Sequence, residues 1–323
     1  MVVISAVGVL GGMGILAGAL LAVASKVFHV EVDKKIIEIR NALPGANCGA
    51  CGFPGCDGMA NAIAEGRAPA NGCPVANSDA HAKIAEIMGV NAESSEKKVA
   101  HVMCQGCDSV AKQKYEYNGV QDCKAAAAVM GGNKSCDKGC LGFGNCKVVC
   151  AFDAIEIVDG LAVINKDKCT SCGKCIEECP KAVIELVPYK NNVIVGCHNK
   201  DFGKAVKDVC TVGCIGCKIC EKNCAFDAIH VTDNLAKVDY DKCTHCMVCV
   251  EKCPTKAIQG DLLARKKAFI VEEGCIGCTI CAKNCPVGAI EGELKKAHKV
   301  DPDKCIGCNV CAAKCPKKTI EMK

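Results

Sequence analysis

The fold is decided by residues 214–254, which read CIGCKICEKNCAFDAIHVTDNLAKVDYDKCTHCMVCVEKCP. Each end of this stretch has three cysteines at positions i, i+3 and i+6, and a fourth cysteine four residues later. One tight loop can present three thiolates to a cubane of metal ions but cannot supply the fourth. Two such runs in succession solve this problem, because each can give its fourth cysteine to the other.

This spacing, C-x2-C-x2-C-x3-C-P, is typical of bacterial ferredoxins with two [4Fe–4S] clusters. Six runs of this kind begin at Cys136, Cys169, Cys214, Cys243, Cys275 and Cys305. The longest interval lies between the second and third runs, so we pair the runs in the order in which they occur. The sequence therefore predicts three tandem two-cluster modules, each a small α+β unit that needs its clusters for stability.

Crossed ligation assigns four cysteines to each of six clusters. The sets in the first module are Cys136, Cys140, Cys146, Cys179 and Cys150, Cys169, Cys172, Cys175. The sets in the second are Cys214, Cys217, Cys220, Cys253 and Cys224, Cys243, Cys246, Cys249. The sets in the third are Cys275, Cys278, Cys281, Cys315 and Cys285, Cys305, Cys308, Cys311. The run at 136–150, CDKGCLGFGNCKVVC, departs from the usual pattern, with spacings x3, x5 and x3.

Short β-hairpins are expected between paired runs. Residues 154–165 (AIEIVDGLAVIN) and 228–239 (AIHVTDNLAKVD) have two apolar segments around a two-residue turn. The turns fall at Asp159-Gly160 and Asp233-Asn234, which are residue types that accept a positive φ.

A seventh cluster is predicted in residues 43–76, LPGANCGACGFPGCDGMANAIAEGRAPANGCPVA. The ligands are expected to be Cys48, Cys51, Cys56 and Cys73. The glycines of this segment let the backbone wrap closely around a cluster and direct N–H groups at its sulfides. Zinc is the alternative metal here.

Five cysteines remain outside these sets: Cys104, Cys107, Cys123, Cys197 and Cys210. In two places an apolar, strand-like segment ends in a cysteine, and a second cysteine follows a stretch that contains lysine. One hypothesis is an eighth cluster bound by Cys104, Cys123, Cys197 and Cys210, with Cys107 either spare or substituting for one of them. The other is that these are buried free thiols.

Composition supports clusters over the other uses of cysteine. The 323 residues include 33 cysteines, 7 Phe, 4 Tyr and no Trp, so large core side chains are scarce. An odd cysteine count and metal-loop spacing argue against a secreted disulfide protein, and triple runs argue against structural zinc. The formal charge of +4 counts cysteines as neutral, whereas a cluster with four thiolates carries about −2. The loaded protein would be acidic, and nothing points to a nucleic-acid partner.

Residues 2–27 are almost entirely apolar, with Lys26 near the end, and are long enough to cross a bilayer. A cleaved signal peptide is the alternative, but the basic region that precedes such peptides is missing. The positive charges that follow predict a single-pass helix in the cytoplasmic membrane, with the clusters on the cytoplasmic side.

The predicted organisation has seven parts. They are an anchor (1–27), an N-terminal [4Fe–4S] domain (28–90), a segment with Cys104, Cys107 and Cys123 (91–135), module 1 (136–187), a segment with Cys197 and Cys210 (188–213), module 2 (214–262) and module 3 (263–323).

No phosphate loop, dinucleotide fingerprint or nucleophile–base pattern is present in the sequence, so the chain is expected to carry single electrons between partners. The apolar N-terminus, the motif CGACGFPGC with Cys73, and KSCDKGCLGFGNCKVVC resemble the B-type iron–sulfur subunit of the Rnf complex. The resemblance covers essentially the whole chain. It implies a membrane-bound ferredoxin:NAD+ oxidoreductase that translocates Na+ or H+. The iron–sulfur component would accept electrons from reduced ferredoxin and pass them to membrane, flavin-bearing and NAD-binding subunits.

Two other functions stay open from the sequence. One is a membrane-attached polyferredoxin that serves a hydrogenase or a heterodisulfide-type reductase without ion pumping. The other is a cysteine-rich metal-storage or structural zinc protein, which iron and acid-labile sulfide would exclude.

Overall fold

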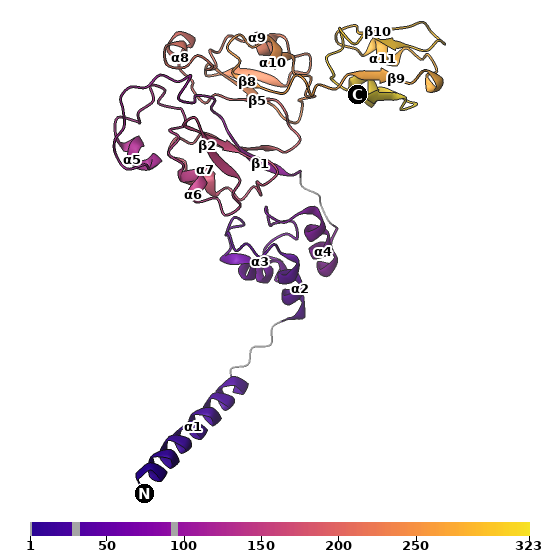
Figure 1. Ribbon diagram of the computed structural model, residues 1–323. Helices are drawn as coiled ribbons and strands as arrows, with labels where there is room; N and C mark the ends of the chain where they lie inside the picture. The colour runs from indigo at the N-terminus through magenta and orange to yellow at the C-terminus, as the bar shows by residue number, and fades with distance from the viewer. Residues whose placement is uncertain (1, 28–32, 92–95) are drawn as a thin grey trace. The chain divides into compact units, whose positions relative to one another are not determined.

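A computed structural model describes residues 2–27, 33–91 and 96–323, with backbone only at 2–7, 9, 25 and 27. The chain divides into two compact units, residues 1–94 and 95–323, and we describe each by itself (Figure 1). The predicted α+β class is confirmed, because short helices and short strands alternate along the second unit.

Helix α1 (Val2–Val27) follows the apolar N-terminal run, and side chains such as Leu16 and Leu20 are exposed. As far as the described residues go, none of the helices is long and apolar enough to cross a membrane. The predicted transmembrane span is therefore not confirmed.

The rest of the first unit is a helical domain made of α2 (Lys34–Ala42), α3 (Gly55–Ala64) and α4 (Ser78–Met88). Asp33 and Asn77 cap α2 and α4, because their side chains accept backbone N–H groups of the first turn. The helices pack around a core that contains Ile39, Met59 and Ile63.

The second unit repeats one arrangement three times. Each repeat has a hairpin and a second pair of strands, one before and one after the hairpin, and every sheet has two antiparallel strands. The hairpins are β2 (Ile155–Val158) with β3 (Leu161–Ile164), β6 (Ile229–Thr232) with β7 (Leu235–Val238), and β10 (Ile290–Glu291) with β11 (Lys299–Val300). The outer pairs are β1 (Lys98–Val102) with β4 (Ile184–Pro188), β5 (Ile194–Val195) with β8 (Ile258–Gln259), and β9 (Ala268–Ile270) with β12 (Ile320–Met322).

Strands β1 and β5 come from the segments predicted at 91–135 and 188–213. Each pairs with the last strand of the following module, so both segments are built into the repeats. Short helices complete the unit: α5 (Cys123–Ala128), α6 (Asn145–Val148), α7 (Lys174–Glu178), α8 (Gly203–Val209), α9 (Ile219–Lys222), α10 (Val248–Lys252), the 3-10 helix η1 (Glu272–Gly274), α11 (Ile280–Lys283) and α12 (Val310–Lys314).

Both predicted hairpin turns are confirmed. Asp159 and Gly160 have φ of 48° and 63°, and Asp233 and Asn234 have φ of 50° and 60°. Two consecutive positive φ values are those of a type I′ turn, whose twist matches that of the strands on either side.

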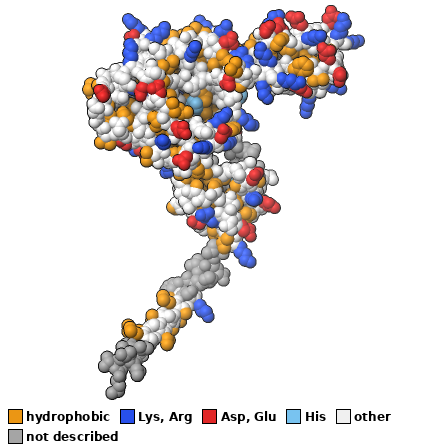
Figure 2. All heavy atoms as spheres, in the orientation of Figure 1, with side chains coloured by type: hydrophobic (Ala, Val, Ile, Leu, Met, Phe, Trp, Pro, Cys, Tyr) orange, Lys and Arg blue, Asp and Glu red, His pale blue; other side chains and the backbone are white. Residues whose placement is uncertain are grey.

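Surface charges add little to the stability of this unit. Lys and Arg side chains are interspersed with Asp and Glu over the face shown in Figure 2. The ion pairs of this unit include Lys242 with Asp227 at 3.1 Å. Exposed pairs of this kind contribute little to stability, because water and salt screen their charges. The modules must therefore be stabilised mainly from inside, where cysteines make up much of each core.

Gly142 shows how closely a cysteine loop approaches a hairpin turn. It lies two residues after Cys140 with φ of 81°, and a Cβ there would overlap the carbonyl oxygen of Gly160. We expect Gly142→Ala to destabilise the protein by at least about 2 kcal/mol, from the left-handed backbone and the overlap with a carbonyl that cannot move alone. The urea concentration at which the cluster absorbance bleaches would measure the effect.

Gly173→Ala is the matched control. Gly173 has φ of 77°, but nothing lies within 4 Å of the added Cβ. It should cost only the backbone preference, about 1 kcal/mol. Equal effects of the two substitutions would contradict the close approach at Gly142.

Candidate metal centres

Five cavities in the second unit are each lined by four cysteines. Three of them are lined by sets that the sequence predicted. We number the sites of the second unit 1 to 7 in the order in which they neighbour one another, as described below. Site 5 has Cys224, Cys243, Cys246, Cys249; site 6 has Cys285, Cys305, Cys308, Cys311; site 7 has Cys275, Cys278, Cys281, Cys315. In each, three cysteines come from one run and the fourth from its pair, as crossed ligation requires.

The other two cavities group the cysteines differently from the sequence prediction. Site 2 is lined by Cys123, Cys140, Cys146 and Cys179, and site 3 by Cys104, Cys136, Cys197 and Cys210. The sequence placed Cys136 in the first of these sets and Cys123 in the second. The structure exchanges the two, and it brings all of the predicted eighth set except Cys123 to one cavity.

Local contacts explain this exchange. The backbone N–H of Cys123 donates to Asn145 Oδ1 at 2.6 Å, and Asn145 Nδ2 donates to Asp122 Oδ2 at 2.6 Å. The start of α5 is thereby joined to the start of α6, which carries Cys146. On the other side, Asn199 Nδ2 lies 3.6 Å from Cys136 Sγ and holds this thiol toward the loop of Cys197. The spacing x3 after Cys136 is the sequence signal that this run does not form one ligand loop.

Two further predicted sets are brought together around a buried thiol. Burial, and then the like charges of Cys169, Cys172 and Cys150, raise the pKa of Cys175 to about 12. We call this set site 1. Burial, and then the like charges of Cys214, Cys217 and Cys253, raise the pKa of Cys220 to about 11. We call this set site 4.

The first unit contains the remaining predicted set, which we call the N-site (Cys48, Cys51, Cys56, Cys73). Burial raises the pKa of Cys73, and the like charges of Cys51 and Cys56 act in the same direction. The N–H of Cys56 donates to Asn47 Oδ1 at 2.8 Å, which brings the residue beside Cys48 to the start of α3. His81 Nε2 lies 2.9 Å from the carbonyl oxygen of Cys73 and ties this loop to α4.

Backbone N–H groups point at several of the sulfur atoms. The fourth cysteine of each opening run accepts from the N–H four residues later: Cys150 from Ala154 at 3.4 Å, Cys224 from Ala228 at 3.4 Å, and Cys285 from Ala289 at 3.2 Å. Such donors stabilise negative charge on sulfur and are one way in which a protein sets a cluster's potential.

The donor set fits iron–sulfur clusters. All 33 cysteines are free thiols. Burial is the largest cause that raises the pKa of Cys104, Cys146 and Cys249, each to about 12. Thiols buried in this way do not ionise at neutral pH by themselves, whereas a bound metal centre would deprotonate its thiol ligands outright. Among the described residues, no three or more His, Cys, Asp or Glu side chains converge on a single metal-ion position.

Sites 1 to 7 form a series of neighbours through the second unit. Thiols of successive sites are close enough to act on one another's pKa: Cys175 and Cys146, Cys140 and Cys104, Cys197 and Cys214, Cys220 and Cys249, and Cys246 and Cys308. Cys311 of site 6 and Cys281 of site 7 belong to one core. The N–H of Cys140 also donates to Cys104 Sγ at 3.5 Å, directly joining site 2 to site 3.

Cys107 lines none of the five cavities. Its Sγ lies 3.1 Å from Ser109 Oγ, and Ser109 donates to Asp159 at 2.7 Å.

Comparisons with known proteins also identify iron–sulfur domains in this chain. The Fe-S cluster family model matches residues 43–75, the 4Fe-4S dicluster domain matches 268–322, and the 4Fe-4S binding domain matches 162–185 and 236–259. The B-type subunit of the Na(+)-translocating ferredoxin:NAD(+) oxidoreductase complex of Acetobacterium woodii is 52% identical, over 82% of this chain and 80% of its own. The chain belongs to the family of B-type iron–sulfur subunits of the Rnf complex.

Two other members of the family match over similar lengths. The B-type subunit of the ion-translocating oxidoreductase complex of Methanosarcina acetivorans is 45% identical, over 80% of this chain and 98% of its own. Its counterpart in the proton-translocating ferredoxin:NAD(+) oxidoreductase complex of Clostridium ljungdahlii is 41% identical, over 76% and 88%. The resemblance found in the sequence is thus confirmed. As a family member with 4Fe-4S domains, the chain is an iron–sulfur electron-transfer subunit of an Rnf-type oxidoreductase.

Proposed function

We propose that this Rnf iron–sulfur subunit carries eight [4Fe–4S] clusters, one at the N-site and one at each of sites 1 to 7. The single observation that carries the proposal is the series of four-cysteine sets at sites 1 to 7 of the second unit, in which thiols of each set lie near those of the next. A bound cluster would supply one-electron transfer at each site. The chain's own part is to hold the thiolates, to donate N–H groups to sulfur and to keep successive sites close together.

The series gives sites 1 and 7 as the two ends of the path in the second unit. We propose that electrons enter from reduced ferredoxin at the module 3 end and leave toward the N-site and the membrane partners. Module 3 supplies the terminal pair, sites 6 and 7. Site 1 lies beside β1, where the second unit begins, because the N–H of Ala100 donates to Cys169 Sγ at 3.3 Å.

Attachment to the cytoplasmic membrane through residues 2–27 is part of the same proposal, with the clusters on the cytoplasmic side. The sequence has no Asp, Glu, Lys or Arg before Lys26, and apolar side chains of α1 such as Leu16 and Leu20 are exposed. The partner subunits would bind flavin and NAD and would translocate the ion.

The experiment is to purify the full chain from membranes together with its partners. We expect flavin-bearing subunits to co-purify, and the assembly to reduce NAD+ with electrons from reduced ferredoxin. Cys48→Ser should lower this rate more than about tenfold while the signals of sites 1 to 7 remain. Co-purification with a hydrogenase or a heterodisulfide-type reductase, without flavin-bearing membrane subunits, would instead favour the polyferredoxin function.

A further inference from the structure

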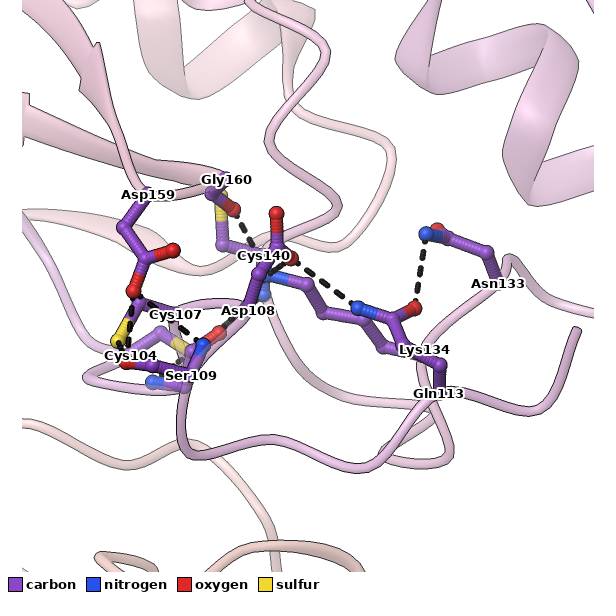
Figure 3. Close-up of polar contacts among 11 residues, drawn as sticks. Cys104, Cys107, Asp108, Ser109, Gln113, Asn133, Lys134, Cys140, Asp159 and Gly160 are labelled. Atoms are coloured by element: carbon purple, nitrogen blue, oxygen red, sulfur yellow. Dashed lines mark hydrogen bonds and ion pairs between the residues drawn. The ribbon is translucent and has the colours of Figure 1, made fainter. Parts of the chain in front are cut away.

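Lys134 is a charged side chain in the interior of the second unit, only 1% exposed. Its Nζ donates to the carbonyl oxygens of Gly106 at 2.9 Å and Gly160 at 2.7 Å, and lies 3.2 Å from Asp108 Oδ1. Figure 3 shows the side chain pointing toward Asp108 and Gly160, beside Cys140. Burial of an ammonium group is costly unless it is hydrogen-bonded and paired, and these three oxygens meet that requirement.

The ammonium group lies between the walls of sites 2 and 3. Lys134 itself lines the cavity of site 3, as does Gly106, whose N–H donates to Cys104 Sγ at 3.3 Å. The Gly160 carbonyl on its other side abuts Gly142, which lines the cavity of site 2. One buried positive charge is therefore shared by two neighbouring cysteine sets.

We propose that Lys134 is a positioning residue for electron transfer that raises the reduction potentials of the clusters at sites 2 and 3. The inference rests on the proposed cluster assignment. Reduction adds one negative charge to a cluster, and a fixed positive charge close by in a medium of low dielectric stabilises the reduced form. Asp108 is 49% exposed, so it offsets the Lys134 charge only in part. Lys134 thereby favours the presence of an electron at the two sites where the path passes from module 1 to module 2.

Two substitutions of opposite sign test this proposal in the full-length chain, by redox titration followed with EPR. Lys134→Gln removes the charge but keeps an N–H donor for the carbonyls. It should make reduction of both clusters at least about tenfold less favourable, a shift of about 59 mV to more negative potential for a one-electron step. Asp108→Asn removes the counter-charge and should shift the same two potentials in the positive direction.

Three controls separate charge from structure. Lys134→Arg keeps the charge and should leave both potentials close to those of the wild type. Lys112→Gln makes the same change of charge at an exposed position of the neighbouring loop and should shift neither. The signals of sites 2 and 3 are assigned by their loss in Cys179→Ser and Cys210→Ser, respectively.

The outcomes are distinguishable. Unshifted potentials in Lys134→Gln with full iron content would overturn the role of Lys134. If Lys134→Gln loses iron, Asp108→Asn decides: a positive shift supports the role, and no shift overturns it. Failure of the wild-type protein to show signals that Cys179→Ser and Cys210→Ser remove would instead overturn the cluster assignment.

Discussion

Cys123→Ser is expected to abolish the cluster at site 2, and Cys136→Ser the cluster at site 3. Each variant should lose about four iron atoms per chain, because on the proposed assignment each site binds one [4Fe–4S] cluster. The sequence pattern alone predicts the reverse, since it groups Cys136 with the ligands of module 1. The difference follows from the hydrogen bonds that join Cys123 to Asn145 and Cys136 to Asn199.

Each variant is compared with a reference variant that removes a ligand assigned to the same site by both groupings. The EPR spectrum of reduced Cys123→Ser should match that of Cys179→Ser, and the spectrum of Cys136→Ser should match that of Cys210→Ser. The opposite matching would restore the sequence-based grouping. Cys107→Ser is the control, because this thiol lines neither cavity, and it should keep all of its iron.

Either loss should interrupt electron transfer almost completely. On the proposed assignment sites 1 to 7 form a single series, and among the described residues no second row of four-cysteine sets runs beside it, so a missing cluster leaves a gap in the path. Changes in the outer shell of a metal site alone typically cost 10–100-fold in activity. We therefore expect ferredoxin-dependent NAD+ reduction by the assembled complex to fall by more than about 100-fold in both variants, and in Cys107→Ser to stay near the wild-type rate.

Removal of all clusters is expected to unfold the second unit. Each repeat has only two-stranded sheets and short helices, and an isolated two-stranded hairpin is at best marginally stable in water. The cores are made largely of cysteines and small aliphatic residues. A structural metal site in a small domain contributes on the order of 10 kcal/mol to folding. Chelation under oxidising conditions should abolish the far-UV circular dichroism of residues 95–323 and expose them to proteolysis.

The stability against unfolding depends on pH with opposite signs in the loaded and the cluster-free chain. Bound thiolates stay deprotonated far below the unfolded thiol pKa of about 8.5, so the loaded protein loses stability as the pH falls below that value. Without clusters, burial raises the pKa of Cys146 from 9.0 to about 12. The stability that this buried neutral thiol contributes is present below the unfolded pKa and is lost as the pH rises toward 12. Whatever structure survives chelation at pH 7 should therefore be lost at pH 10.

Rebuilding with iron and sulfide is the control for chemical damage, and it should restore both the circular dichroism and the resistance to protease. A cluster-free chain that keeps its secondary structure and resists protease at pH 7 would show that the protein core suffices for folding.

Much of this protein could be predicted from local sequence. The runs at Cys214 to Cys253 and Cys275 to Cys315 contain complete ligand loops, because three of the four thiolates lie within seven residues of one another. The turn residues Asp159-Gly160 and Asp233-Asn234 fix the hairpins by their backbone preferences. The same local motifs identified the Rnf family of iron–sulfur subunits.

Other features required the tertiary structure. Strands β1 and β5 are too short and too distant from β4 and β8 in sequence to be paired by pattern. Site 3 takes Cys104, Cys136, Cys197 and Cys210 from four separate loops, so no spacing rule could assemble it. Lys134 lies in an ordinary polar stretch, and its burial depends on the loops of Gly106 and Gly160 closing over it.

The stretch at residues 214–254 thus determined by itself the chemistry and the repeating unit, because cysteine spacing within one loop sets which thiolates can reach one cluster. Only the tertiary structure decided which of Cys123 and Cys136 serves which site, and how the modules join into one series. Those outcomes depend on hydrogen bonds and packing between loops far apart in the chain, where sequence spacing no longer limits distance.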